Sequence, residues 1–437
     1  FTSFSILPAF RFDNYSRLNG SNGALLKNGQ FDDLANNLVR DFKAGAYFSS
    51  RDVTDRLSIF GGMLLGIGAQ PSDGIGDFFS PERLTQLDRD IFLIAEHRGL
   101  PFLKTSWSPT VAIEVYNLHR NVRNGLSIVE FPCTSCLPET SFTDISFEIW
   151  EADLFLRSKI NRGSMLELGV GFSPYRVNTQ DFFSKELNQF VPGSSSEYFR
   201  STTLSAAYNF NFYLPDRDRD IAPVGTKGYV RYQYQPSRLL NQFDIEDGQL
   251  VPIYDRFRNH SIEVNTRYGH RFADRYTFQL QTRAFTYLDN PDNFFFLDYI
   301  GGFIGMRSYP FFAIGGNRTA FSSLSYFAPI WTNINKQAGP YTFDKVYARL
   351  FFEAGNGWQG PLEIGDNIKK GIGAELRFSL SGYYLFPLRF FVSGSYGFDR
   401  FSVTLPDEFI TNTDNNRVQY GREFLFHFGL TFDFELL

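Results

Sequence analysis

The sequence predicts an all-β protein whose strands form one 16-stranded antiparallel transmembrane β-barrel. Three observations support this fold class. Aromatic residues make up 18 % of the chain, with 51 Phe and 23 Tyr against three Met, and such side chains favour strands. Apolar and polar residues alternate with period two in many segments. About sixteen such segments occur, each near the ten residues that a tilted strand needs to cross a bilayer.

The alternation is clearest at the end of the chain. Every even position from Phe424 to Leu436 is Phe or Leu, while the odd positions include Asp433 and Glu435. The same pattern recurs at residues 372–378. Successive side chains of a strand point to opposite faces, so each segment has one apolar and one polar face. In a barrel the apolar face meets lipid and the polar face lines the lumen.

The alternating segments define the expected strands in chain order. They lie at residues 3–13, 38–49, 55–68, 89–98, 108–118, 144–157, 164–173, 201–213, 226–235, 260–270, 275–287, 318–330, 345–355, 368–380, 387–398 and 423–436. No spacer or composition shift divides them, so residues 1–437 are expected to form a single barrel domain. In hydrocarbon every strand needs hydrogen-bond partners on both sides, which favours closure.

The connections are expected to alternate in length. Long ones are predicted at residues 14–37, 69–88, 119–143, 174–200, 236–259, 288–317 and 399–422, and short ones at 50–54, 158–163 and 271–274. Outer-membrane barrels have short periplasmic turns and long extracellular loops. The asymmetry therefore places both termini in the periplasm.

The net charge and the lengths of the apolar runs exclude several classes of protein. A net charge of −5 indicates no nucleic-acid partner. The longest uncharged apolar runs, such as Gly61–Ala69, are too short for a membrane-spanning helix. The chain begins at Phe1, which leaves room for a signal peptide or an upstream periplasmic module.

One arginine stands out in a glycine- and aromatic-rich connection, Gly301–Asn317. Downstream, Lys345, Arg349 and Glu353 share one face of a strand and should point into the lumen. If the connection folds inward, Arg307 can meet Glu353 there and latch the loop inside the barrel. The alternative is a luminal charge that fills space in an inert barrel.

These two segments resemble a known family, the outer-membrane protein assembly and two-partner secretion barrels typified by BamA, TamA and FhaC. The loop reads Met306-Arg307-Ser308-Tyr309, and the strand reads Phe351-Phe352-Glu353-Ala354-Gly355-Asn356. The resemblance implies sixteen strands, an inward-folded sixth extracellular loop, and location in the bacterial outer membrane. It also implies insertion or translocation of client proteins.

The sequence departs from the family pattern at several points. Ser308 stands where the family has Gly, and Glu353 where it has Asp. The chain ends in Leu437 rather than an aromatic residue, and periplasmic POTRA domains are absent from it. The segments "DRDIFLIAEHRGLPF" and "SPTVAIEVYNLHR" resemble related barrels that follow a TolB-like propeller, so an upstream propeller is a further expectation.

The resemblance also implies a lateral seam between the first and last strands, marked here by Pro8 and Phe434. Proline has no amide hydrogen for the ladder, so this seam should lack one bond, unless the position simply faces no partner. Clients would pair with the exposed edge by β-augmentation. The expected partners are outer-membrane lipids and lipopolysaccharide, client or partner proteins and an upstream module. The alternative function is a passive pore or a scaffold component of a larger secretion complex.

Other constellations favour ordinary structure. Cys133 and Cys136 are expected to form a small disulfide in a long loop, with a metal contribution or free thiols as alternatives. The alternating carboxylates of residues 216–220 suggest the start of a calcium loop, but Ile221 replaces the required glycine, which favours a solvated turn. The five histidines form no catalytic motif. We therefore expect no enzyme activity, no metal and no cofactor.

Overall fold

The computed structural model describes most of the chain. The described residues are 2–12, 42–54, 56–66, 87–99, 109–130, 139–184, 189–216, 218–219, 221–246, 249–302, 305–339, 341–360, 367–381, 387–404 and 417–432. Within these ranges almost all regular structure is β-strand, and the one short helix is the 3-10 turn η3 (Phe294–Phe296). No helix in the described part is long and apolar enough to span a membrane.

One antiparallel sheet contains the long strands of the described chain. It has seventeen strands, of which β17 (Lys336–Ala338) is a three-residue addition, so sixteen long strands remain, as predicted. They are β1 (Thr2–Phe12), β2 (Phe42–Asp52), β3 (Leu57–Gly66), β4 (Asp88–Arg98), β5 (Thr110–Glu130), β6 (Glu139–Asn161), β7 (Ser164–Thr179), β10 (Ser195–Tyr213), β11 (Gly225–Glu246), β12 (Gln249–Ala273), β13 (Tyr276–Tyr287), β16 (Arg318–Trp331), β18 (Tyr341–Trp358), β19 (Lys369–Ser381), β20 (Pro387–Gly397) and β23 (Phe424–Phe432). Each overlaps one predicted segment.

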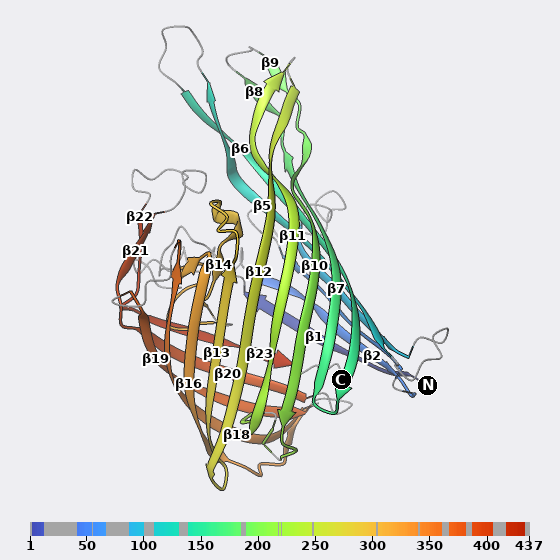
Figure 1. Cartoon of the computed structure of the whole chain (residues 1–437), viewed down its shortest axis with the longest axis vertical. Helices are drawn as coiled ribbons and strands as arrows, with labels where there is room; N and C mark the ends of the chain where they lie inside the picture. Colours follow the sequence, from blue (N-terminus) through green and yellow to red (C-terminus); the bar gives the residue numbers. More distant parts are fainter. Residues whose placement is uncertain are drawn as a thin grey trace.

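The sheet curves around a central space, with β1, β2, β20 and β23 drawn behind β10 to β12 (Figure 1). Each strand pairs with its neighbours in the chain, so the order is that of a simple up-and-down wall. This topology is the antiparallel pairing of long strands that follow one another in the sequence.

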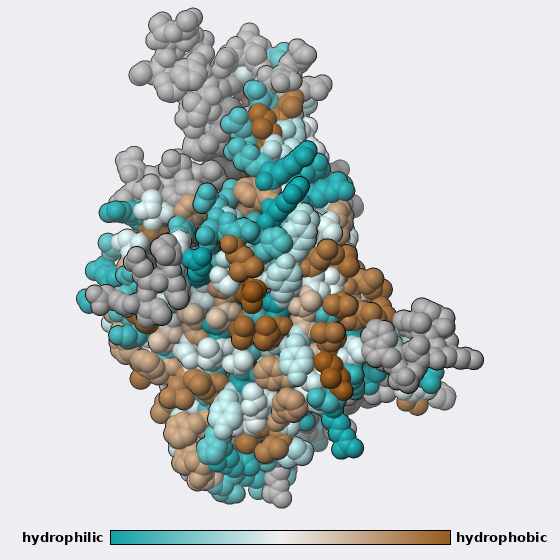
Figure 2. Space-filling model, in the orientation of Figure 1, coloured by the Kyte–Doolittle hydropathy of each residue, from teal (hydrophilic) through white to brown (hydrophobic). Residues whose placement is uncertain are grey.

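The wall is inside-out relative to a water-soluble protein. In β7 the outward Leu166, Leu168 and Val170 are 42 %, 48 % and 50 % exposed, whereas Glu167 between them is 5 % exposed. In Figure 2 hydrophobic residues gather over the middle and lower part of the visible strand surface. Apolar residues outside and charges inside are the arrangement that a lipid environment stabilises. The predicted assignment of faces is therefore confirmed.

Three of the predicted long loops are largely strand in the structure, including 174–200, where β7 continues to Thr179 and β10 begins at Ser195. β5 and β6 stay paired as far as Glu130 and Glu139, and β11 and β12 as far as Glu246 and Gln249. Residues 119–130 with 139–143, and 236–246 with 249–259, thus form tall two-stranded ladders that rise above the rest of the wall (Figure 1). Neighbouring strands can satisfy each other's backbone groups in water as well as in lipid, so the ladder need not stop at the membrane.

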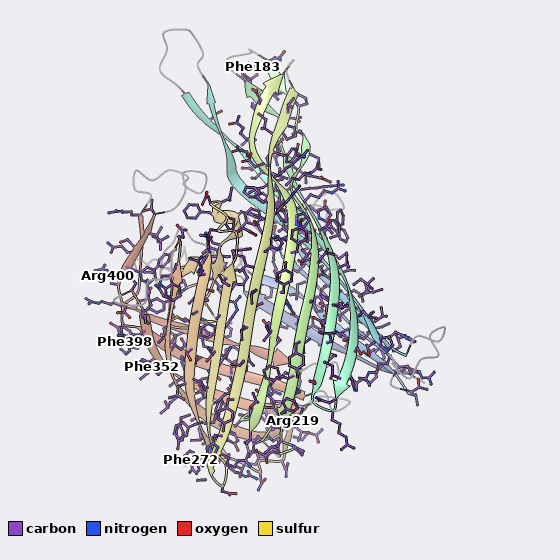
Figure 3. All side chains as sticks on the ribbon, in the orientation of Figure 1. Phe183, Arg219, Phe272, Phe352, Phe398 and Arg400 are labelled. Carbon is purple, nitrogen blue, oxygen red and sulfur yellow. The ribbon has the colours of Figure 1, made fainter. Side chains whose placement is uncertain are left out.

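The two ends of the wall are distinct. Phe183 of β8 (Phe182–Ser184) lies at one end, called here the hairpin end, and Arg219 and Phe272 lie at the other, called the short-turn end (Figure 3). At the short-turn end residues 162–163 join β6 to β7, and residues 274–275 join β12 to β13. The short turns predicted at 158–163 and 271–274 thus both lie at this end, but β11 and β12 are separated by only two residues at the hairpin end, so short turns are not confined to one side.

The first and last strands each have one partner. β1 pairs with β2 and β23 pairs with β20, and over the described residues no hydrogen-bonded pairing joins β1 to β23. Closure of the ring by backbone bonds therefore stays a prediction. Pro8 lies in β1, opposite Ala46 of β2, and its side chain is exposed. A proline fits this place because outermost strands tolerate a missing donor.

Candidate functional site

The candidate site is a folded segment between β13 and β16 that packs inside the wall. β14 (Asp298–Tyr299) pairs with β15 (Gly315–Gly316), and Ile300 N donates to Ile314 O at 3.0 Å. We call residues 299–316 the luminal loop. Its buried apolar residues form a cluster with a residue of β16 and one of β22 (Arg417–Tyr420), a short strand that pairs with β21 (Phe401–Thr404). The cluster consists of Ile300, Met306, Tyr309, Ala313, Ile314, Phe321 and Tyr420.

Arg307 lies at the inner end of the luminal loop and is 8 % exposed. Its guanidinium forms an ion pair with Glu375 of β19, whose side chain is fully buried, and lies 5.6 Å from the ring centre of Phe351. Burial lowers the pKa of Arg307 to about 9, with Arg377 acting in the same direction, so the group stays protonated at neutral pH. A buried charge paired in this way is costly to separate from its partner.

Glu375 is shared by three cations. Besides Arg307, it pairs with Arg377 of its own strand and with Arg349 of β18, the latter at 3.5 Å. Sequence reasoning missed Glu375 as a partner of the loop. The signal was present, because Glu375 stands on the charged face of the predicted strand 368–380.

Glu353 of β18 holds the residue next to Arg307. Its carboxylate accepts from the backbone N and the Oγ of Ser308, both at 3.3 Å. Ser308 thus contributes a hydroxyl donor at this point, where the family that the sequence resembles has glycine. The direct pairing of Arg307 with Glu353 stays a prediction, and the carboxylate is in place to fix the backbone of the loop.

Tyr309 anchors the far side of the same turn. Its hydroxyl donates to Lys370 O at 2.8 Å and accepts from Asp399 N at 3.1 Å. Met306, Ser308 and Tyr309 have no exposed surface. The four consecutive residues singled out in the sequence are thus all buried against the wall.

Glycines of the wall make room for the loop. A Cβ added at Gly355 would lie 2.8 Å from Met306 Sδ, and one added at Gly371 would lie 2.2 Å from Ser308 Oγ. These distances are far below ordinary van der Waals contact. Gly355, predicted as a neighbour of the latch, therefore permits the close approach of the loop, and Gly371 does the same on β19.

We expect Gly371→Ala to loosen the luminal loop without unfolding the sheet. The added methyl group overlaps Ser308, and overpacking of a tight contact costs about 1–3 kcal/mol. Limited proteolysis of the folded protein should then cut the loop faster. Gly394→Ala is the matched control, because a Cβ there meets only Phe426 at 3.4 Å. Equal cleavage rates for the two variants would contradict this account of the contact.

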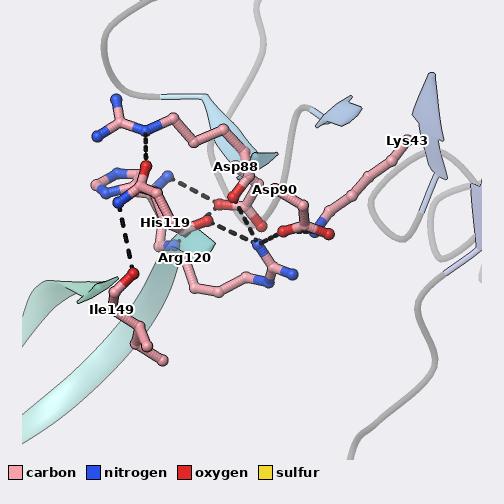
Figure 4. A network of polar contacts seen from close by, with 9 residues as sticks. Lys43, Asp88, Asp90, His119, Arg120 and Ile149 are labelled. Carbon is pink, nitrogen blue, oxygen red and sulfur yellow. Dashed lines mark hydrogen bonds and ion pairs between the residues drawn. The ribbon is translucent and has the colours of Figure 1, made fainter. Parts of the chain in front are cut away.

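A second polar network joins the first strands (Figure 4). Lys43 of β2 donates to Asp90 of β4 at 3.2 Å, and Arg120 of β5 pairs with the same carboxylate. The side chain of Lys43 is only 3 % exposed. These ion pairs connect β2 to β4 and β5. β1 lies beyond them as the outermost described strand, and its backbone ladder binds it to β2.

The remaining predicted residues fall in two groups. Phe434, Cys133 and Cys136 lie outside the described residues, so the seam position and the disulfide stay predictions. Asp216 pairs with Arg271, and Asp218 pairs with Lys345 and Arg275. In the described ranges no three His, Cys, Asp or Glu side chains form a group that could hold a metal.

Fold and site together define a class: a sixteen-stranded antiparallel wall of the outer-membrane-barrel type, with an arginine-bearing loop buried inside it. Among solved structures, the chain is similar to BamA from Haemophilus ducreyi lacking POTRA domains 1–3. The TM-score is 0.50 and the identity 10 %, over 98 % of this chain and 70 % of that chain. At this identity the likeness concerns the fold, and it confirms the resemblance stated from the sequence at that level.

The chain is also similar to CdiB from Acinetobacter baumannii, with TM-score 0.43 and 11 % identity over 88 % of this chain and 57 % of that one. For CdiB from Escherichia coli the values are 0.44, 11 %, 89 % and 60 %. The chain thus spans less than two thirds of either CdiB. No protein-family model and no curated protein sequence matches it.

Proposed function

We propose that this chain is the barrel of a bacterial outer-membrane protein that inserts or translocates client proteins through the seam between β1 and β23. The observation that supports the proposal is that β1 and β23, the first and last of sixteen long strands, each have one paired strand among the described residues. The BamA-like fold supports it. We further propose that residues 1–437 form one barrel domain, with both termini in the periplasm.

The seam offers a chemically simple way to receive clients. In this proposal the side of β1 opposite β2 presents backbone donors and acceptors, and a client strand pairs with them without specific side chains. Lipids and lipopolysaccharide would surround the apolar face, and a periplasmic module would deliver clients from below. Neither step requires a catalytic group, so the proposal involves no enzyme activity and no cofactor.

In this proposal the luminal loop supports the barrel wall from inside. Arg307, bound to Glu375 and adjacent to Glu353, would latch the loop against β18 and β19. A fixed loop stiffens that side of the wall, so that opening is confined to the seam. The latch thus has a mechanical role and does not contact clients.

Locking the seam tests the proposal. With Cys133 and Cys136 replaced by serine, cysteine pairs in staggered register are placed in β1 and β23 and joined by short bis-maleimides. We expect locked protein to lose client insertion or secretion in cells, because the edge of β1 is no longer available. A lock between Ser5→Cys of β1 and Ser49→Cys of β2, which are already register partners, is the control.

Full activity of the seam-locked protein would reject lateral opening. The alternative, a passive pore or a scaffold component, would then be favoured. A specific feature supports the pore: a luminal cavity of about 1380 Å³ lies along β4 to β13, with Glu114, Arg157 and Arg231 in its lining. In that case the lock should leave the conductance of planar bilayers unchanged.

A further inference from the structure

The connection between β10 and β11 differs from the other turns at the short-turn end. It comprises residues 214–224 and does not stay beneath its own strands. Ile221 and Ala222, each 1 % exposed, pack with Phe327 of β16 and Tyr347 of β18. In the sheet, β12 and β13 separate β11 from β16. The segment, called here the inner turn, must therefore extend across the lumen to reach these residues.

Ion pairs hold the inner turn in this position. Asp218, whose side chain is 3 % exposed, lies 3.5 Å from Lys345 Nζ of β18 and 3.8 Å from Arg275 Nε. Asp216 pairs with Arg271 of β12. The backbone of the turn closes on itself, because Ala222 N donates to Asp218 O at 2.7 Å. The carboxylates read in the sequence as a solvated turn are thus partly buried counter-ions.

Arg377 connects the inner turn to the luminal loop. Its Nε pairs with Glu375, the carboxylate that also holds Arg307, and one of its terminal nitrogens donates to Ile221 O at 3.4 Å. Its guanidinium lies 5.3 Å from the ring centre of Phe327, a member of the inner-turn cluster. Contacts therefore run without interruption from Arg307, through Glu375 and Arg377, to the inner turn.

We propose that the inner turn, like the luminal loop, fills part of the lumen, that it enters from the short-turn end, and that Arg377 couples the positions of the two segments. If either segment is displaced, the buried charges of Glu375 and Arg377 lose one of their partners. The free energy of keeping the other segment in its position then becomes less favourable. Arg377 is a positioning residue in this account. The two segments fill the interior of the barrel and are coupled whether or not the chain handles clients.

Hydrogen exchange of the full chain in lipid nanodiscs tests the coupling. Asp218→Asn removes the charge that seats the inner turn, so we expect amide exchange in residues 214–224 to accelerate at least about tenfold. Because Arg377 connects the two segments, exchange in residues 299–316 should accelerate as well. In Arg377→Met protein, Asp218→Asn should still affect the inner turn but add nothing in the loop. Asp274→Asn, an exposed carboxylate of a neighbouring turn, is the control.

Two results would overturn the proposal. Faster exchange confined to the inner turn in Asp218→Asn protein would reject the coupling through Arg377. Unchanged exchange in both segments would reject the seating of the inner turn by Asp218. Lys345→Met is the milder second variant, should Asp218→Asn fail to insert, because it leaves Arg275 beside the carboxylate. The hydrogen-exchange experiment does not measure client transport. A negative result would therefore reject the coupling of the two segments without bearing on the proposed function.

Discussion

Arg307→Ala is expected to destabilise the folded protein by about 3–5 kcal/mol, the usual cost of removing one partner of a buried ion pair. Glu375 keeps Arg349 and Arg377 as partners, so the lower end of this range is expected. The loss also removes the stacking of the guanidinium on Phe351. Urea unfolding in lipid vesicles, followed by the altered gel mobility of folded barrels, measures the change.

Double-mutant cycles separate the two carboxylates of the site. Arg307→Ala combined with Glu375→Gln should show a larger coupling free energy than Arg307→Ala combined with Glu353→Gln, because the ion pair of the structure is with Glu375. Partial recovery in Arg307→Glu/Glu353→Arg protein would instead favour the pairing predicted from the sequence. If the Arg307→Ala protein unfolded with the same free energy as the wild type, the latch hypothesis would be rejected.

Leu168→Arg is expected to prevent or strongly impair insertion into membranes. Leu168 is 48 % exposed on the outer face of β7, about midway along the predicted segment 164–173, where a charge costs about 2–4 kcal/mol in a membrane barrel. The yield of folded protein after dilution from urea into vesicles measures the effect. This variant tests the central physical claim, that the apolar face meets hydrocarbon.

Leu214→Arg is the matched control for depth. Leu214 is exposed to a similar degree, 57 %, but follows the end of β10 at the short-turn end. Near the interface an arginine costs only about 0–1 kcal/mol, because its long side chain reaches water. Equal folding yields for the two variants would show that no depth-dependent apolar environment surrounds the wall.

Local pattern was sufficient to find the strands. Sixteen segments with period two correspond one to one to the long strands of the sheet, because the alternation records which face of each strand meets water. The lengths of the strands were less predictable than their positions. β11 and β12 continue beyond the predicted strands 226–235 and 260–270, and their backbone ladder persists as far as Glu246 and Gln249. Composition cannot distinguish such a hairpin from a loop.

The site was predictable in part. The sequence indicated that Arg307 would be buried and that the charged faces of residues 345–355 and 368–380 would line the lumen. It could not assign Glu375 rather than Glu353 as the ion-pair partner, because both carboxylates lie on the same inner surface and the choice depends on how deep the loop enters. The inner turn was read as solvated, since its burial depends on strands far away in the sequence.

What the sequence by itself determined is the wall: strand number, order, antiparallel pairing and the face that each side chain takes. These features follow from local alternation and from the pairing of strands that are neighbours in the sequence. Only the tertiary structure decided how the lumen is filled, because the contacts of Arg307 with Glu375 and of Arg377 with Ile221 join segments distant in the chain. Such contacts depend on the curvature of the whole sheet, which no single segment encodes.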